Sequence, residues 1–237
     1  MNDHEIKIKD NIQVNTVSKA IVNETSKFGF KRSDYISLVN DLLDVSIINP
    51  ADIELKAKSK STSRNTKLKF PLRGEQIQLK LFNMKNDYNI IEKWLNDDAG
   101  QWFLLDRSSY RDKTFRQIIE NERNIFGIIS LPDNIPIGLM AFLNYDETNN
   151  KAEMRKLIGE KIYREKGYAK EATTLWIRYG VRNLGLKKIY LNTIENNIRN
   201  ITLNRELGFQ IEGLLSKEFL INGEYCDVLR MAYIVED

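Results

Sequence analysis

Hydrophobic residues recur every three or four positions in two stretches near the N-terminus, residues 17–21 and 35–43. This spacing predicts two amphipathic helices, with Ser33 and Asp34 as candidate caps at the start of the second. The connection between the stretches is short, so we expect a helical hairpin. Because about 50 residues rarely build an independent core, the hairpin should bury its apolar faces on the main domain or on a second copy of the chain.

A change in composition separates this extension from the rest of the chain. After Glu54 the sequence is rich in Lys, Ser, Arg and Thr and has no acidic residue up to Gly74. Such a stretch is typical of a solvated linker, and a basic arm that touches a phosphate-bearing partner is the alternative. We therefore predict a helical extension over 1–53, a basic linker over 54–69 and a main domain over 70–237.

The first half of the main domain has a mixed pattern. Residues 77–81 alternate between apolar and polar, as in a half-buried strand, and Asn86 or Asp87 is expected to cap the helix that follows. Three apolar runs then follow, separated by turn-rich segments. They cover residues 124–131, 136–144 and 152–158, and they predict three antiparallel strands in a meander.

The second half alternates helices and strands. Helical periodicity extends from 167 to 182 and again from 198 to 206, with a strand at 187–193 between them and further strands at 209–215 and 225–235. This order of elements predicts an α+β domain with a mixed sheet whose helices lie on the sheet faces.

Composition sets limits on the function. The 237 residues are 42% hydrophobic, enough for a proper core, and the net charge of +3 is too small to imply nucleic-acid binding. No apolar run has the length of a membrane span and no signal peptide is recognisable, which favours a cytoplasmic protein. The single cysteine, Cys226, and the single histidine, His4, leave no Cys and His cluster for a metal.

Residues 164–169 have the character of a turn that opens a helix and exposes backbone N–H groups. A helix start combines unpaired amides with the positive end of the helix dipole, so phosphate binds there readily. Gly167 allows the backbone to approach an oxygen closely, Ala169 is small, and Lys166 and Lys170 add positive charge. We expect a phosphate-binding turn; the alternative is a purely structural strand-to-helix connection.

The segments around this turn carry a family pattern. Arg164, Gly167 and Ala169 fit the sequence Arg or Gln, two residues, Gly, one residue, Gly or Ala. Further matching segments are 71–74, 94–97, 152–159, 207–209, 212–213 and 223–227. From about residue 70 to the end, the chain resembles the GNAT superfamily of acyl-CoA N-acyltransferases, in the branch with ribosomal-protein N-terminal, polyamine and amino-sugar acetyltransferases. This resemblance implies a mostly antiparallel central sheet flanked by helices.

The resemblance also implies how a cofactor binds: acetyl-CoA is the acetyl donor, and no metal is needed. The strand before the turn is expected to splay from its neighbour and pair with the pantetheine arm, while the turn holds the diphosphate. Asn197 would bind the arm further along, or it caps the helix that begins near Ile198. The residues expected to contact the cofactor are Lys156, Leu157, Ile158, Arg164, Lys166, Gly167, Tyr168, Ala169, Lys170 and Asn197.

The expected chemistry is attack of a neutral amine on the acetyl thioester. A lysine-like amine, with a pKa of about 10.4, must first lose a proton at a cost of roughly 4 to 5 kcal/mol at pH 7, so a base helps. Glu153 is the candidate base, with a cross-strand ion pair as its structural alternative. An N–H of Leu157 or Ile158 would hold the oxyanion. Asn204 occupies the place where many relatives carry a Tyr that protonates the leaving thiolate.

A small amine such as an amino sugar or polyamine is the preferred acceptor, with a protein N-terminus as the alternative. Tyr225 and Asp227, on a late strand, face the acceptor or are structural. A non-catalytic CoA-binding scaffold is a second hypothesis, and nucleic-acid binding through the basic linker is a third, not favoured. We expect no membrane partner, and a homodimer is compatible with the helical extension.

Overall fold

The computed structural model describes residues 16–47, 67–96, 100, 103, 115–194, 197–221 and 223–236. Contacts divide the chain into two compact units, Met1–Lys56 and Ala57–Asp237. The predicted boundary at residue 53 and most of the predicted linker lie outside the described residues, so both stay predictions. Asp97, in the matching segment 94–97, lies outside them too.

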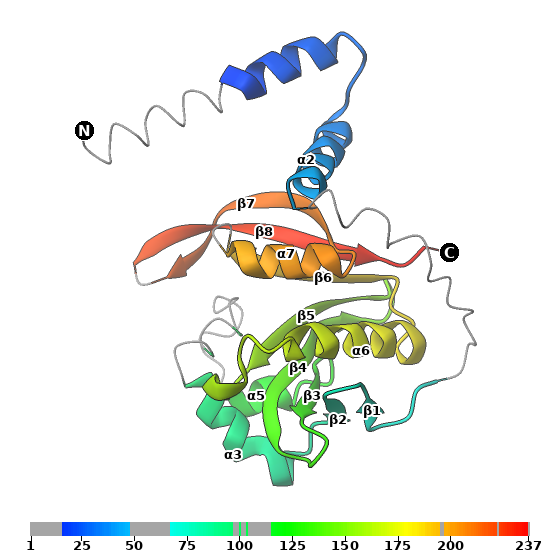
Figure 1. The fold of residues 1–237 in the computed structure, drawn as a ribbon, viewed down its shortest axis with the longest axis vertical. Helices are drawn as coiled ribbons and strands as arrows, with labels where there is room; N and C mark the ends of the chain where they lie inside the picture. The colour runs from blue at the N-terminus through cyan, green and yellow to red at the C-terminus, as the bar shows by residue number, and fades with distance from the viewer. Residues whose placement is uncertain are drawn as a thin grey trace. The chain divides into compact units, whose positions relative to one another are not determined.

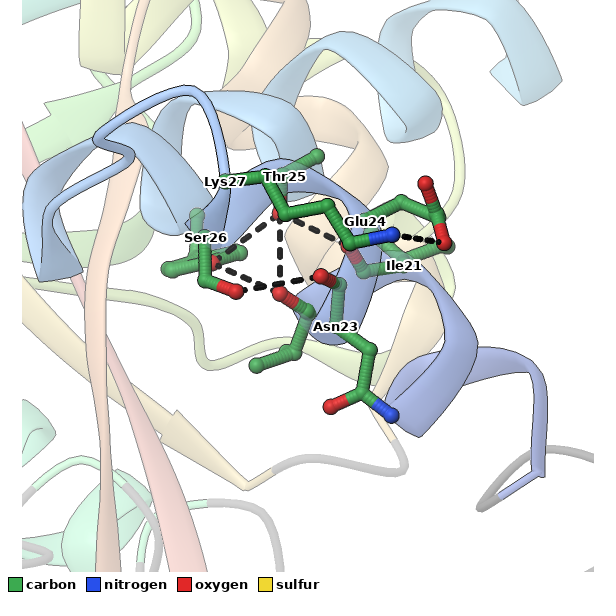
Figure 2. A network of polar contacts seen from close by, with 8 residues as sticks. Ile21, Asn23, Glu24, Thr25, Ser26 and Lys27 are labelled. Atoms are coloured by element: carbon green, nitrogen blue, oxygen red, sulfur yellow. Dashed lines mark hydrogen bonds and ion pairs between the residues drawn. The ribbon is translucent and has the colours of Figure 1, made fainter.

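The N-terminal unit contains two helices, one over residues 16–26 and α2 over Arg32–Ile47, as the periodicity predicted. Thr25 links them, because its Oγ1 lies 2.7 Å from the carbonyl oxygen of Ile21 and 3.0 Å from the hydroxyl of Tyr35. Figure 2 shows the polar network at the end of the first helix. The two helices are therefore connected by side-chain hydrogen bonds as well as by the short turn.

Asp34 caps α2 from inside the helix. Its Oδ2 accepts the backbone N–H of Lys31 at 2.6 Å, so the third helical residue reaches back to the residue before the helix, as in a capping box. The side chain of Ser33, the other predicted cap, lies outside the described residues. Apolar side chains such as Phe28 and Leu42 are exposed on this unit, and what covers them stays a prediction.

Within the described residues, the C-terminal unit is built on one sheet of eight strands, ordered β1-β2-β3-β4-β5-β6-β8-β7 (Figure 1). The strands are β1 (Leu72–Arg73), β2 (Gln78–Leu81), β3 (Ile125–Ser130), β4 (Pro136–Asp146), β5 (Lys151–Ile158), β6 (Lys188–Ile194), β7 (Gln210–Ile221) and β8 (Glu224–Ile234). Every neighbouring pair is antiparallel except β5 and β6, which are parallel. The predicted meander and the mixed, mostly antiparallel sheet are confirmed.

Helix α3 spans Met84–Leu95 and begins earlier than the sequence analysis predicted. Its N-cap is Asn83, whose Oδ1 accepts from the N–H groups of Lys85 and Asn86 at 3.0 and 3.3 Å. The prediction that Asn86 or Asp87 caps this helix was wrong. Asn83, Asn86 and Asp87 are all residue types that suit a cap; Asn83 takes the role, and Asp87 accepts the backbone N–H of Asn83 from within the helix.

Helices cover both faces of the sheet. Helix α3 and the short α5 (Phe115–Ile119) pack on one face, in a buried cluster with Leu139 and Leu157. The long α6 (Tyr168–Asn183) and α7 (Ile198–Glu206) lie on the other, and both are visible in front of the sheet in Figure 1. Successive residues of a strand point to opposite faces, so Phe142 stacks on Trp176 of α6 with ring centroids 5.0 Å apart.

One residue of the predicted linker contacts the main domain, and one strand is longer than predicted. Leu68, which the composition placed in the linker, exchanges two hydrogen bonds of 2.9 Å with the side chain of Asn183 at the end of α6. Strand β7 continues to Ile221 instead of ending at 215. Its register shifts between Leu215 and Phe219, and this bulge accommodates polar residues that break the alternation in the sequence.

Candidate active site

Strands β5 and β6 separate along their length. They pair only from Lys151 to Glu153, opposite 188–190, and the ladder does not continue beyond Glu153. A cavity of about 820 Å³ lies between the diverging halves, lined by residues 154–158 of β5 and 191–194 of β6. This volume is within the range of pockets that bind small molecules. The predicted splay of the strand before the turn is therefore present, and it creates the cavity.

The turn after β5 meets the start of α6 at the cavity. Gly167 is the N-cap of α6, with a left-handed backbone (φ +84°) and no side-chain cap hydrogen bond. Its carbonyl accepts the N–H groups of Lys170 and Glu171 at 3.0 and 3.3 Å, which leaves the first amides of the helix, at Tyr168 and Ala169, pointing beyond it. These amides are available to an anion, as the sequence analysis expected of this turn.

The basic residues of the turn differ in what they contact. Arg164 folds back: its Nε and one terminal nitrogen donate to the carbonyls of Ile158 and Gly159, both at 3.0 Å. Lys170 forms an ion pair of 2.6 Å with Glu206 of α7. The ammonium of Lys166 lies 5.6 Å from the ring centre of Tyr163. Arg164 thus shapes the turn as well as lining the cavity, while the two lysines lie on exposed surface around it.

Asn197 lies at the cavity on the start of α7. Its side chain accepts the N–H of Asn200 at 3.3 Å and so caps the helix, and both residues line the cavity. Asn200 in turn donates to the hydroxyl of Thr193 on β6 at 3.1 Å. Asn197 therefore caps the helix and also faces the space expected for the pantetheine arm.

Lys156 and Asn204 meet inside the site. The Lys156 side chain leaves β5 on the face covered by α6 and α7, and its Nζ donates to Asn204 Oδ1 at 2.5 Å. Asn204 is fully buried, and its Nδ2 has no hydrogen-bond partner among the residues that the structure describes. Burial lowers the pKa of Lys156 to about 7. A lysine that lines the cavity is thus held by a neutral amide rather than by a carboxylate.

Glu153 lies on the opposite face of β5. It is buried, forms an ion pair with Arg155 two residues along the same strand, and is 3.4 Å from the side-chain amide of Asn192. Arg155 and Asn192 line the cavity, whereas Glu153 does not. The predicted base therefore does not line the cavity itself but contacts Arg155, which does. Its ion-pair partner is on the same strand rather than across the sheet.

The structure does not place Tyr225 or Asp227 on the cavity wall. Tyr225 is exposed, and Asp227 Oδ1 accepts the N–H of Lys217 at 2.7 Å, which supports the bulge of β7. Cys226, between them, does line the cavity. Because neighbouring strand residues face opposite ways, the inward position of Cys226 turns Tyr225 and Asp227 to the other face of β8, where Asp227 makes its contact with Lys217.

Several residues of the cavity wall were not predicted from the sequence. Arg155, Asn192, Thr193, Cys226 and Phe103 all contribute to the wall. The alternation of β5 was a signal for Arg155, since it shares a face with Leu157. The others come from strands or loops whose approach to β5 is a property of the tertiary fold.

In the described part of the chain, no group of three or more His, Cys, Asp or Glu residues is arranged to hold a metal ion. Over the same residues, the helices are too short or too polar to cross a membrane.

The site suits a long ligand with an anionic end. Ala169, in the first turn of α6, lines the cavity, and the edge of β5 that faces β6 offers backbone hydrogen bonds beyond Glu153. The described wall carries Arg155, Lys156 and Arg164 and no carboxylate. No described atom lies within 4 Å of the position that a Cβ on Gly167 would occupy, so the space beside this glycine is open. These features fit the diphosphate and arm of acetyl-CoA.

Comparison with known proteins gives a consistent result. The acetyltransferase (GNAT) domain family matches residues 79–210, which include most of the cavity wall. The spermidine N(1)-acetyltransferase of Escherichia coli K12 is 29% identical over 161 residues, covering 68% of this chain and 82% of the relative. That of Vibrio cholerae is 30% identical over 156 residues, covering 66% and 86%.

Solved structures of spermidine N-acetyltransferases are similar to this chain as well. A crystal structure of spermidine N-acetyltransferase from Vibrio cholerae, in complex with CoA and spermine, is similar with a TM-score of 0.58 and 25% identity. The similarity covers 67% of this chain and 95% of that one. A dodecameric structure of the same kind of enzyme from Vibrio cholerae gives a TM-score of 0.56.

Proposed function

This chain belongs to the acetyltransferase (GNAT) family, and we propose that it transfers the acetyl group of acetyl-CoA to a primary amine of a small polyamine. The observation that carries the proposal is the cavity between the separated halves of β5 and β6, which ends at the free amides of α6. The similarity of this chain to proteins named spermidine N-acetyltransferases supports a polyamine as the acceptor.

In this proposal the protein binds the donor mainly through its backbone. The amides of Tyr168 and Ala169 hold the diphosphate, the free edge of β5 from Lys156 to Ile158 pairs with the arm, and Asn197 contacts it from α7. Lys166 and Lys170 add positive potential at the surface around the diphosphate. An N–H of Leu157 or Ile158 stabilises the oxyanion that develops on the acetyl carbonyl. Assembly of the chain into homodimers or larger oligomers belongs to the proposal as well.

Glu153 has two candidate roles here. It accepts the proton of the amine through a water molecule, or it holds Arg155 against the cavity wall. The variant Glu153→Gln separates them: loss of a base lowers kcat about 10² to 10⁴-fold and flattens its rise with pH. Loss of a positioning contact raises the KM for the amine and leaves the shape of the profile unchanged.

The function is tested by thiol release from acetyl-CoA in the presence of an amine panel. The panel contains spermidine, spermine, glucosamine and a peptide with a free N-terminus, each checked by mass spectrometry for the acetylated product. We expect turnover with the polyamines. Tight binding of CoA with no turnover across the panel would overturn the proposal and favour a non-catalytic CoA-binding module.

An amino sugar is the second candidate acceptor, and one observation favours it. A polycation is recognised best by carboxylates, yet the described cavity wall has three basic side chains and no acidic one. The ratio of kcat/KM for glucosamine and spermidine decides between the two. A higher value for glucosamine would replace the polyamine as the preferred substrate.

A further inference from the structure

The Lys156–Asn204 contact joins the two elements that border the cavity. Lys156 belongs to β5 next to the expected oxyanion donor Leu157, and Asn204 belongs to α7, whose first residues also line the cavity. The two residues are 48 positions apart in the sequence. Their hydrogen bond therefore places a primary amine beside the unpaired edge of β5, where the thioester lies under the proposed function.

The surroundings of this lysine are those of a proton donor rather than of a structural cation. A structural lysine is normally paired with a carboxylate, as Lys170 is with Glu206 and Lys188 with Glu212. Lys156 instead donates to the neutral Oδ1 of Asn204. This oxygen can accept an N–H from the lysine in both protonation states of the amine.

Near neutral pH, the Lys156 amine is present in both its charged and its neutral form. Burial alone lowers its pKa to about 7, so near neutral pH the amine both gives and accepts a proton readily. The charged side chains on the elements around it contact other groups: Glu153 pairs with Arg155, Lys170 pairs with Glu206, and Arg164 donates to two backbone carbonyls. Lysine at its ordinary pKa of about 10.4 would be a much weaker acid.

We propose that Lys156 is the general acid of the acetyl transfer, which protonates the departing sulfur of CoA, and that Asn204 is the positioning residue that aims it. This inference rests on the proposed function. It gives the sulfur a proton donor in a chain that has Asn204 where a tyrosine was expected.

The step balances within the site. The amine nitrogen forms a bond to the acetyl carbon, the carbon–sulfur bond breaks, and its electron pair stays on sulfur. The proton of the Lys156 ammonium passes to that sulfur, which leaves a neutral lysine and free CoA thiol. The nitrogen of the new amide loses a proton, which returns to Lys156 directly or through water. Each cycle restores the ammonium, and no other reactant is needed.

The decisive experiment compares Lys156→Met and Lys156→Arg with wild type and with Lys151→Met. Lys151 lies on the same strand outside the cavity and carries a partly exposed ion pair with Asp146, so it is the matched control. Both Lys156 variants should lower kcat about 10²-fold or more while the Kd for CoA, measured by calorimetry, changes little. Arginine keeps the charge but is too weak an acid to replace the lysine.

The leaving group provides a readout that a purely structural role would not move. S-(4-nitrophenyl) thioacetate releases a thiol that is far more acidic than that of CoA and leaves without protonation. The ratio of wild-type to Lys156→Met rates should therefore fall toward one with this donor. An equal ratio for both donors would overturn the inference. Should Lys156→Met be unstable, a solvent isotope effect of wild type that is the same for both donors would overturn it too.

Asn204 is tested by Asn204→Asp. A carboxylate at this contact raises the pKa of Lys156, so the ammonium persists and the fall of kcat with rising pH should move to higher pH. An unmoved profile would contradict the positioning role. These failures differ from failure of the proposed function, because in that case wild type itself shows no turnover with any amine.

Discussion

Gly167 carries the backbone conformation on which the turn proposed to bind phosphate depends. Its φ of +84° lies in the left-handed region, which costs a residue with a Cβ about 1 to 2 kcal/mol. There is space for a side chain at this position, so the need for glycine is conformational and not steric. The same conformation directs the following amides of α6 toward the cavity.

We expect Gly167→Ala to lower stability by about 1 kcal/mol and to weaken CoA binding, because relief of the strain rotates the amides of the turn. Gly185 is the matched control, since it also has positive φ (+68°) and no atom near its Cβ position, but follows the far end of α6. Urea denaturation and calorimetry with CoA measure the two effects. Equal losses of CoA affinity in both variants would contradict the assignment of the site.

Single residues also explain the unequal roles of the three strand residues 225–227. Only Cys226 reaches the cavity, while Asp227 holds the bulge at Lys217. The pleat of β8, and not the chemical character of the side chains, thus decides which of the three reaches the cavity.

At the scale of elements, the contact between α3 and the end of β5 determines where the turn begins. The ring of Trp94 packs directly on Gly159, where an added Cβ would lie 2.2 Å from the ring. The indole N–H donates to Glu160 at 2.9 Å, and Lys93 adds an ion pair of 3.1 Å to the same carboxylate. Helix α3 therefore anchors the loop that leads from β5 to the turn before α6.

This anchor predicts a pH-dependent stability. The hydrogen bond from Trp94, and then that from Lys93, lower the pKa of Glu160. A carboxyl whose folded pKa is depressed stabilises the protein above its unfolded pKa, and this contribution disappears as the pH falls through the folded value. We expect Glu160→Gln to be less stable than wild type by up to roughly 1 kcal/mol at pH 7 and equally stable well below pH 4.5.

Urea denaturation between pH 3 and 7 measures this difference. Glu147→Gln, which removes an exposed carboxylate from the turn between β4 and β5, is the control and should show no such trend. If the free energies of unfolding of Glu160→Gln and wild type differ by the same amount at every pH, the ionised carboxylate is not the source of the difference.

At the scale of the whole molecule, the described parts of the candidate site come from one of the two units. The cavity wall runs from Phe103 to Cys226, and the family match spans residues 79–210. The N-terminal unit, Met1–Lys56, brings two helices with exposed apolar side chains and no described residue of the cavity. Catalysis and this extension are therefore expected to be separable.

We expect a chain that begins at Ala57 to keep kcat/KM within about threefold of the full chain, a change of roughly 0.6 kcal/mol or less in transition-state stabilisation. The measurement is thiol release at matched protein concentration, with size-exclusion chromatography to compare oligomeric state. A truncated protein that is folded but inactive would assign the helical extension a part in the reaction.

Much of the fold was accessible from local patterns. Hydrophobic spacing identified α6 and α7 and the meander of β3, β4 and β5, because period and turn residues act over a few neighbours. The errors at α3 and β7 have local causes as well: competing caps in one case, and a bulge that hides the alternation in the other.

Within the site, the sequence alone determined the features that a short segment carries by itself. The glycine turn with its helix start and the cap at Asn197 are of this kind. Only the tertiary structure decided that Lys156 meets Asn204, that Glu153 is buried behind Arg155, and that β5 parts from β6 after three residue pairs. The physical reason is that burial, the pKa of a lysine and the gap between two strands depend on residues far apart in the chain, which the packing of helices on the sheet brings together.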